Sequence, residues 1–358
     1  MAFRSTPRGF SIQPIGRFVG ASQPEFACFS YDDNHEFHLD DSSLRYYYTP
    51  QLGADLSRGF DTFEKLDDSV DGHLDALLKT ITAHERDTGK KIDADIVTWR
   101  GMMTKGCIFI EENHGFKMKS RQNEDPRRQR KGPSLDVMSF WGYKFETLST
   151  LPRPWGETPR AYIEGRESQV VNNKAQYCSV VRTGIGRSIL CLGGEVDAVW
   201  DAKPTEAGKP INWVELKTSA QIRGQGDADA FHRKLMKYWI QSFLLGVPKI
   251  IIGFRTREGI LAEIKEIETQ SIPQTVNARA NATWNADVCV NFTAAFLDWL
   301  KQTINDEGVW RISCQPAVSS SIEVFKVEET GHGDILSDDF KNWRIKLALG
   351  SETSSSAQ

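Results

Sequence analysis

The sequence predicts one large α/β domain, and two observations support this fold class. No run rich in glycine, serine and proline divides the 358 residues into two domains. Short apolar runs of strand length also alternate along the chain with longer segments whose apolar residues recur at helical spacing. Hydrophobic residues form 39% of the chain and charged residues 26%, which is ordinary for a globular domain with a sizeable core.

Composition and missing motifs exclude several classes of protein. No apolar run approaches the roughly 18 residues that a membrane span needs, and the amino terminus lacks the apolar core of a secretory signal, so we expect neither a membrane partner nor export. The six cysteines are scattered without a C-x-x-C pair, which favours a reducing compartment, the nucleus or the cytosol. The chain also lacks the P-loop and H-E-x-x-H motifs, which excludes P-loop nucleotide hydrolysis and zinc proteolysis.

The first part of the chain is predicted to alternate strands with two helices. Apolar runs predict strands at 26–30, 36–39, 92–99 and 107–111. Apolar residues at helical spacing predict a helix at 69–86, capped by Asp67 or Asp68, and a second helix at 135–148. A cluster of Arg45 with three tyrosines precedes the first helix. It could stack bases or contact phosphates, and the alternative is packing on both faces of a strand.

The second part of the chain continues the same alternation. Strands are predicted at 176–182, 188–192, 250–254 and 310–313, and helices at 228–245 and 293–305. Before them, Trp155 stands in a turn between prolines and a glycine. An exposed tryptophan there would suit a protein contact, and burial against the core is the alternative.

Charge is unevenly distributed along the chain. Residues 117–131 hold seven basic and two acidic residues, and we expect a mobile basic loop at 117–133. This loop could contact RNA phosphates or act as a nuclear localisation patch, or it is a solvated insertion. We therefore expect an amino-terminal arm at 1–24, one catalytic domain at 25–350 and a disordered tail at 351–358.

The chain is organised around one stretch, Gly193 to Ser219, which reads GGEVDAVWDAKPTEAGKPINWVELKTS. Two strand-like runs in this stretch are joined by a polar connector with turn residues. Residues i and i+2 share a face of a strand, so Glu195 would project with Asp197, and Glu215 with Lys217. We expect these three carboxylates and the lysine to meet on one sheet face.

Three carboxylates in close proximity repel one another and lose hydration, which costs several kcal/mol unless a cation lies among them. A ligand set made only of oxygen suits Mg²⁺ or Mn²⁺ better than zinc. A lysine beside such a metal suggests a group that orients water or stabilises charge on a phosphoryl oxygen. The alternative is a hairpin whose polar face is merely solvated, but the apolar neighbours of these residues indicate burial.

The pairing of GGEVD with WVELKT resembles the active-site core of the DXO/Rai family of RNA 5′-end hydrolases. Four further stretches agree with family blocks and keep the family's order: Thr98 to Lys105, Phe140 to Glu146, Tyr238 to Leu244 and Gly246 to Arg255. The resemblance implies a mixed α/β domain with two β-sheets and flanking helices around a core like that of the PD-(D/E)XK nucleases. It covers roughly residues 25 to 320.

The resemblance also implies roles for individual residues. Divalent metal, Mg²⁺ or Mn²⁺ with two ions, would be bound by a set of acidic residues and one carbonyl: Glu146, Glu195, Asp197, Glu215 and Leu216. Lys217, Glu195 and Gln241 would be catalytic. Arg100, Lys217 and Gln241 would bind substrate, although by itself Arg100 could equally form a structural salt bridge.

The resemblance implies a function in RNA 5′-end quality control. Family members remove pyrophosphate from 5′-triphosphate RNA and remove incompletely methylated or NAD-type caps, and some continue as 5′-to-3′ exonucleases. Fungal nuclear members partner an Xrn-type 5′-to-3′ exonuclease, so we expect this partner and a nuclear location, with the cytoplasm as the alternative. Two other functions stay open at this point: a PD-(D/E)XK-type nuclease acting on DNA, and a non-catalytic protein that stabilises an exonuclease.

Overall fold

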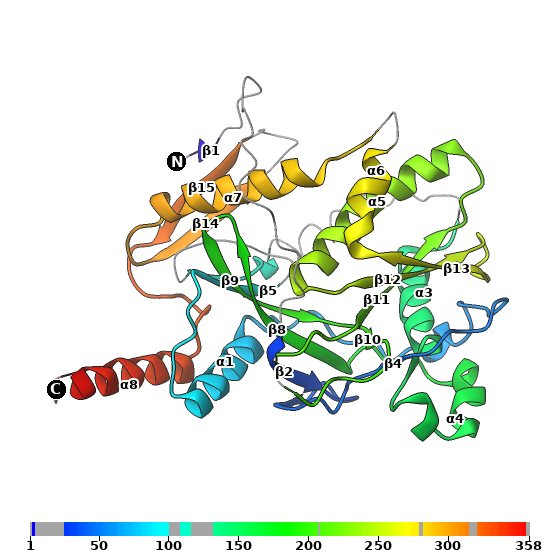
Figure 1. The fold of residues 1–358 in the computed structure, drawn as a ribbon, viewed down its shortest axis with the longest axis horizontal. Helices are drawn as coiled ribbons and strands as arrows, with labels where there is room; N and C mark the ends of the chain where they lie inside the picture. The colour runs from blue at the N-terminus through cyan, green and yellow to red at the C-terminus, as the bar shows by residue number, and fades with distance from the viewer. Residues whose placement is uncertain are drawn as a thin grey trace.

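The computed structural model describes residues 2–3, 25–99, 108–115, 132–206, 208–278, 282–314 and 321–355. It confirms the predicted mixed α/β class, with two six-stranded sheets and helices packed against them (Figure 1). Arg100, most of the expected basic loop and nearly all of the expected amino-terminal arm lie outside the described residues. Within the described ranges, no helix is long and apolar enough to cross a membrane.

The first six-stranded sheet, here called the β9 sheet, has the strand order β3-β2-β8-β9-β5-β6. Its strands are β2 (Glu25–Tyr31), β3 (Phe37–His38), β5 (Ile96–Trp99), β6 (Ile108–Ile110), β8 (Gln176–Ile185) and β9 (Ser188–Glu195). β8 and β9 form a long antiparallel hairpin, and β5 pairs in parallel with both β9 and β6.

The second six-stranded sheet, here called the β11 sheet, has the order β13-β12-β11-β10-β4-β7. Its strands are β4 (Tyr46–Tyr47), β7 (Thr150–Leu151), β10 (Ala198–Val199), β11 (Trp213–Ala220), β12 (Lys249–Arg255) and β13 (Leu261–Glu268). β11 runs parallel to β12 and antiparallel to the short β10. A third sheet joins β1 (Ala2–Phe3), β14 (Val309–Cys314) and β15 (Ile322–Glu328).

Helices cover the sheets and connect their strands. The α-helices are α1 (Asp75–Thr88), α3 (Leu135–Leu148), α4 (Arg160–Gly165), α5 (Gln225–Leu245), α6 (Ile272–Asn277), α7 (Ala286–Thr303) and α8 (Asp338–Ser355). Short 3-10 helices occur at η1 (Phe60–Thr62), η3 (Trp155–Glu157), η4 (Arg166–Ser168) and η5 (Thr269–Ser271). Figure 1 shows α8 extending away from the body of the protein, next to α1. Residues 351–355 of the expected tail belong to this helix.

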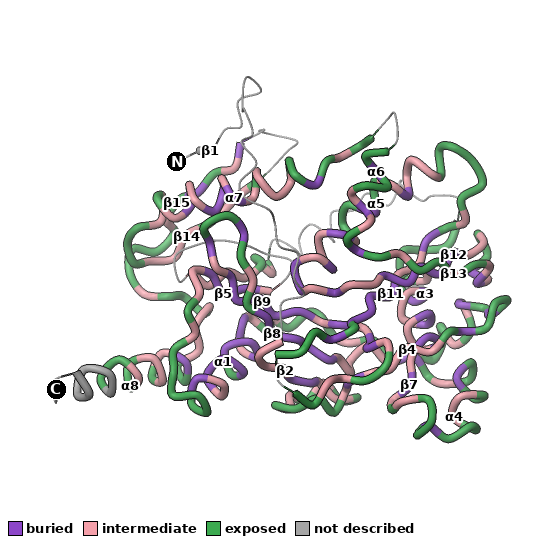
Figure 2. The backbone as a smooth tube through the Cα atoms, viewed as in Figure 1, coloured by how far each residue is buried: buried purple, intermediate pink, exposed green. Residues whose placement is uncertain are grey.

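The core follows from the alternation of side chains along the strands. Leu190 and Leu192 of β9 pack with Leu297 of α7, whereas Cys191 between them packs with Leu77 of α1. Both faces of the β9 sheet are therefore covered, which explains why β9 reads as a continuous apolar run. In Figure 2 the buried residues concentrate in the central strands of both sheets.

The largest errors in predicted boundaries concern the starts of two helices. The helix expected at 69–86 begins at Asp75, and its N-cap is Leu74 rather than Asp67 or Asp68. The chain turns before that point, because His73 has a left-handed backbone with a φ of 44°. The helix expected at 293–305 begins earlier, after Asn285, whose side chain accepts a hydrogen bond from the amide of Val288.

Candidate active site

The predicted carboxylates lie where the chain passes from one large sheet to the other. Glu195 is the last residue of β9, Asp197 lies between β9 and β10, and Glu215 is in β11. The expectation that these side chains share one sheet face was therefore wrong. Two residues suffice for the chain to change sheets: the amide of Val196 still bonds to Tyr177 of the β9 sheet at 3.0 Å, and Ala198 already pairs with Val214.

The backbone amide of Leu216 in β11 bonds to the side chain of Asp197 and not to a neighbouring strand. The ladder between β10 and β11 begins at the pair of Ala198 with Val214, so Leu216 lies beyond it. Its amide instead donates a hydrogen bond of 2.6 Å to Oδ2 of Asp197. The carboxylate thus replaces a strand partner, and the sequence predicts no such contact.

Lys217 lies among the carboxylates from β11. Its Nζ is 2.6 Å from Oε1 of the fully buried Glu215 and 3.8 Å from Oδ2 of Asp197. It also donates a hydrogen bond of 3.1 Å to the carbonyl oxygen of Leu216. The lysine and both carboxylates are well shielded, with exposed fractions of 22% for Lys217, 8% for Asp197 and 0% for Glu215. Shielding strengthens charge interactions at this site.

Glu146 reaches the same site from α3. Burial raises the pKa of its carboxyl well above the ordinary value. The negative charges of Asp197, Glu195 and Glu215 raise this pKa further, and Lys217 lowers it. The four carboxylates therefore interact electrostatically, as predicted for a shared cation site, although they come from three different elements and one connection.

Close contact between α3 and the β11 sheet positions Glu146. Phe140, Trp141 and Phe145 of α3 pack with Val214 and Leu216, the residues that alternate with Glu215 along β11. Phe145 lies directly over Gly253 of β12, where an added Cβ would be 2.6 Å from the ring. A glycine at 253 is thus required for α3 to pack this closely against the β11 sheet. Glu146 follows Phe145 directly in α3, so the same contact positions its carboxylate.

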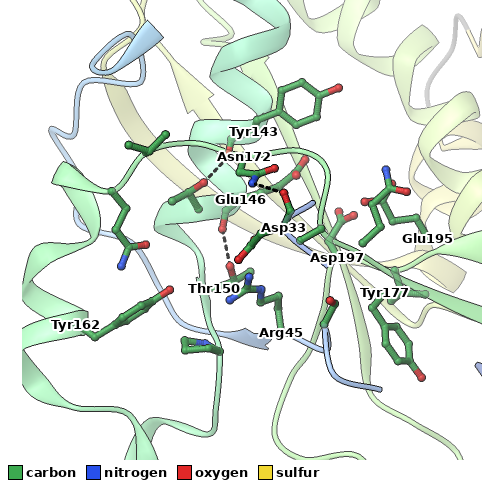
Figure 3. Close-up of a pocket in the computed structure, with 18 residues that line it drawn as sticks. Asp33, Arg45, Tyr143, Glu146, Thr150, Tyr162, Asn172, Tyr177, Glu195 and Asp197 are labelled. Carbon is green, nitrogen blue, oxygen red and sulfur yellow. Dashed lines mark hydrogen bonds between the residues drawn. The ribbon is translucent and has the colours of Figure 1, made fainter. Parts of the chain in front are cut away.

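A cavity of about 450 Å³ opens beside the carboxylates. It lies between α3, α4 and the start of β10, and Glu146, Glu195 and Asp197 line one part of it (Figure 3). The other lining residues are mostly polar: Asp33, Ser43, Arg45, Tyr143, Thr147, Thr150, Pro152, Tyr162, Gln169, Val170, Asn172, Ala175, Gln176, Tyr177 and Val196. A polar cavity of this size next to clustered carboxylates is suited to a charged ligand.

Several of these lining residues were not predicted as site residues. Tyr162 on α4 and Asn172 before β8 carry no local signal of a site in the sequence. Arg45 belongs to the aromatic and basic cluster that could contact phosphates, but the sequence does not place it beside the carboxylates. Their place in the cavity depends on pairing between distant segments, such as Val199 of β10 with Tyr46 of β4.

The structure does not place two of the predicted substrate-binding residues, Gln241 and Arg100, at the carboxylates. Gln241 is partly buried in α5. That helix packs on β11, where the hydroxyl of Tyr238, one turn before Gln241, donates to the carbonyl of Thr218 at 3.4 Å. Arg100 lies outside the described residues. The roles of both residues stay predictions.

The residues at this site fit a divalent cation. Glu146, Glu195, Asp197 and Glu215 offer only carboxylate oxygens, and the carbonyl of Leu216 faces Lys217 beside them. Hard cations such as Mg²⁺ and Mn²⁺ prefer such oxygen ligands. The raised pKa of Glu146 also indicates that Lys217 alone does not balance the negative charge.

Comparison with known proteins shows the family to which this chain belongs. A family model described as RAI1 like PD-(D/E)XK nuclease matches residues 22–341. The protein named Decapping nuclease RAI1 of Gibberella zeae is 70% identical over 368 residues, which cover 95% of this chain and 98% of that protein. The crystal structure of Candida albicans Rai1 in complex with pU5-Mn2+ matches with a TM-score of 0.83 and 32% identity, covering 91% of this chain and 95% of that one.

A second solved structure gives a similar result. Scheffersomyces stipitis Rai1 in complex with (3'-NADP)+ and calcium ion matches with a TM-score of 0.82 and 29% identity, covering 91% of this chain and 96% of that one. The matched family region includes α3, β9, β10 and β11, the elements that carry the carboxylates. From its sequence, its fold and the residues of its site, this chain belongs to the RAI1-like PD-(D/E)XK nuclease family.

Proposed function

We propose that this protein is a metal-dependent hydrolase of RNA 5′ ends, which removes pyrophosphate from 5′-triphosphate RNA and removes incompletely methylated or NAD-type caps. The observation that carries the proposal is the meeting of Glu146, Asp197 and Glu215 with Lys217 at the edge of a polar cavity. The name of the Gibberella zeae relative, Decapping nuclease RAI1, and the complex of the Candida albicans protein with pU5-Mn2+ support an RNA substrate.

Metal binding is assigned to the carboxylates on chemical grounds. Glu146, Asp197 and Glu215 would hold the first divalent ion, with the Leu216 carbonyl as a further ligand, and Glu195 would contribute at a second ion. A bound Mg²⁺ or Mn²⁺ supplies a Lewis acid for the phosphoryl oxygen and lowers the pKa of coordinated water. Asp197 is held for this purpose by the amide of Leu216, which fixes the carboxylate against β11.

Lys217 has a separate task in this proposal. Its ammonium group lies within 4 Å of carboxylate oxygens of Glu215 and Asp197, beside the proposed position of the scissile phosphate. There it orients the attacking water and offsets the negative charge that develops on the phosphoryl oxygens. Arg100 and Gln241 act as substrate-positioning groups, and Gln241 and Glu195 assist the attacking water.

We further propose that the protein works in the nucleus beside an Xrn-type 5′-to-3′ exonuclease. Hydrolysis at the 5′ end leaves a 5′-monophosphate, the end that such an exonuclease consumes. Trp155, which is 66% exposed on η3, is the proposed anchor of this contact, since a large exposed aromatic side chain is typical of interface anchors. The basic segment at 117–133 is the proposed nuclear localisation patch.

The test is product identification with purified protein and Mg²⁺ or Mn²⁺. Separate reactions contain 5′-triphosphate, GpppN-capped, methyl-capped, NAD-capped and 5′-monophosphate RNAs, together with a double-stranded DNA of the same sequence. Release of pyrophosphate or of an intact cap with a 5′-monophosphate RNA is the expected result. Cleavage of DNA alone would favour a DNA nuclease, and no turnover of any substrate with retained exonuclease binding would favour a non-catalytic partner.

A further inference from the structure

Arg45 enters the cavity from a backbone that is fixed next to the metal site. It precedes β4, and its carbonyl oxygen accepts a hydrogen bond of 2.9 Å from the amide of Val199. Val199 belongs to β10 and lies two residues after Asp197. On the other side of Arg45, Leu44 is buried in the core. The base of the arginine side chain is therefore held at a set position relative to Asp197.

Within the described part of the chain, the charge of Arg45 has no ionic partner. Among the described residues that line the cavity, it is the single basic one, beside the acidic Asp33, Glu146, Glu195 and Asp197. Even so, no carboxylate in the described part of the chain lies within 4.0 Å of its guanidinium. Figure 3 shows this side chain reaching into the cavity toward Thr150, with Tyr162 on the same side and Glu195 on the far side.

An arginine in this setting is suited to a phosphate. Its planar guanidinium presents a fork of donors that matches two phosphate oxygens. A partner provided by substrate is consistent with the lack of an ionic partner among the residues that the structure describes. Tyr162 lines the same cavity and offers a ring on which a base can stack. Together they form one nucleotide-sized subsite next to the carboxylates.

The position of that phosphate in the substrate follows from what the proposed substrates share. Triphosphate, cap and NAD-type ends differ on the 5′ side of the scissile bond, but all carry the same RNA on the 3′ side. Because the backbone of Arg45 is held in a fixed position, its side chain can serve every proposed substrate only by contacting the RNA that all of them carry on the 3′ side of the scissile bond.

We propose that Arg45 binds the first internucleotide phosphate of the RNA, 3′ to the bond that is hydrolysed, and so positions the scissile phosphate at the carboxylates. This inference rests on the proposed function of the same site and assigns one residue of the cavity to one group of the substrate. It predicts that turnover depends on the negative charge at that single linkage.

The experiment removes the charge from each side of the contact in turn. Wild type and Arg45→Gln are compared on 5′-triphosphate pentanucleotides that carry one neutral methylphosphonate at the first, second or third linkage. Arg160→Gln serves as the matched control, because Arg160 is 89% exposed on α4 and pairs with Glu164 outside the cavity lining. Circular dichroism and thermal unfolding establish that each variant is folded.

We expect the first-linkage methylphosphonate to lower kcat/KM of wild type by about 10- to 100-fold, the range of a hydrogen bond between charged groups. Arg45→Gln should lose a similar factor on unmodified RNA, and the first-linkage modification should then have little further effect. Arg160→Gln should behave as wild type. Equal sensitivity of wild type and Arg45→Gln to the first linkage would overturn the inference while leaving the proposed function intact.

A binding measurement separates this inference from failure of the proposed function. Fluorescence anisotropy with a labelled 5′-monophosphate pentanucleotide and Ca²⁺ in place of Mg²⁺ reports affinity without turnover. Loss of one phosphate contact in Arg45→Gln should reduce the slope of log affinity against log salt by about 0.7, the value for one contact to a single strand. If wild type hydrolyses no RNA, an unchanged slope in Arg45→Gln overturns the inference, and a reduced slope supports it.

Discussion

The contact between Gly253 and Phe145 predicts that a single methyl group on a residue outside the carboxylate cluster will reduce activity. In Gly253→Ala the new Cβ would lie 2.6 Å from one ring carbon of Phe145 and 2.9 Å from two others. Carbon atoms pack best at about 3.5 to 4.0 Å, so the ring has to withdraw by about 1 Å. Phe145 is completely buried in α3, and the helix has to move with it.

The size of the effect can be worked from these contacts. Overpacking in a dense core costs about 1 to 3 kcal/mol, and replacing glycine by alanine within a strand returns about 0.5 to 1 kcal/mol. We expect a net loss of about 0.5 to 2 kcal/mol in the free energy of unfolding. A shift of about 1 Å in Glu146, the next residue on α3, should reduce kcat by about 100-fold, because misplacement on that scale disrupts catalytic geometry.

Urea unfolding and steady-state kinetics on 5′-triphosphate RNA measure both effects. The matched control is Gly184→Ala in β8, where the nearest atom to an added Cβ is the carbonyl oxygen of Ser188 at 3.9 Å. That variant should match wild type in kcat, and its free energy of unfolding should rise by about 0.5 to 1 kcal/mol because the added Cβ meets no close contact. Gly253→Ala with full activity, or with the same kinetics as Gly184→Ala, would refute the reasoning that this close contact sets the position of Glu146.

Three further predictions concern the carboxylates and the exposed tryptophan. Replacing Glu195 and Asp197 together by alanine should abolish hydrolysis while circular dichroism shows a preserved fold, and undiminished turnover would contradict the metal assignment. Glu146→Gln should raise the free energy of unfolding of the metal-free protein at pH 8. Because the pKa of this carboxyl is raised in the folded protein, its ionisation weakens the fold as the pH rises from the ordinary pKa of 4.5 to the raised value. At a pH below 4.5, the ordinary pKa of this carboxyl, the group is protonated in both the folded and the unfolded state, so the gain in stability should vanish. Urea titrations at pH 4 and pH 8 will check this. Trp155→Ala should abolish co-purification with the exonuclease and leave hydrolysis intact, and unchanged association would exclude this anchor.

Elements with a strong local pattern were predictable from the sequence. The helix expected at 135–148 has these bounds in the structure, since its apolar residues recur at helical spacing and Ser134 accepts a hydrogen bond from the amide of Val137 as its cap. The strand expected at 250–254 lies within β12 for a similar reason, because a short apolar run is bounded by Pro248 and Arg255.

The arrangement of the site was predictable only in part. The spacing of Glu195, Asp197, Glu215 and Lys217 indicated a shared acidic cluster, and the structure brings these residues together. Their assignment to one sheet face failed, because membership of a sheet depends on partners far away in the chain, such as Tyr177 for Val196. No local pattern could show that Arg45 would enter the same cavity.

The path of the chain between the two large sheets also limits how the protein can be divided. Strands β2 and β3 belong to the β9 sheet, β4 to the β11 sheet, β5 and β6 to the β9 sheet again, β7 to the β11 sheet, and β8 and β9 to the β9 sheet. A cut between β4 and β9 therefore leaves strands of both sheets on each fragment. During synthesis the β9 sheet cannot be complete until β9 has been made, and the β11 sheet cannot be complete until β13 has been made. The hydrolase site, which needs residues from both, is completed only after most of the chain has been made.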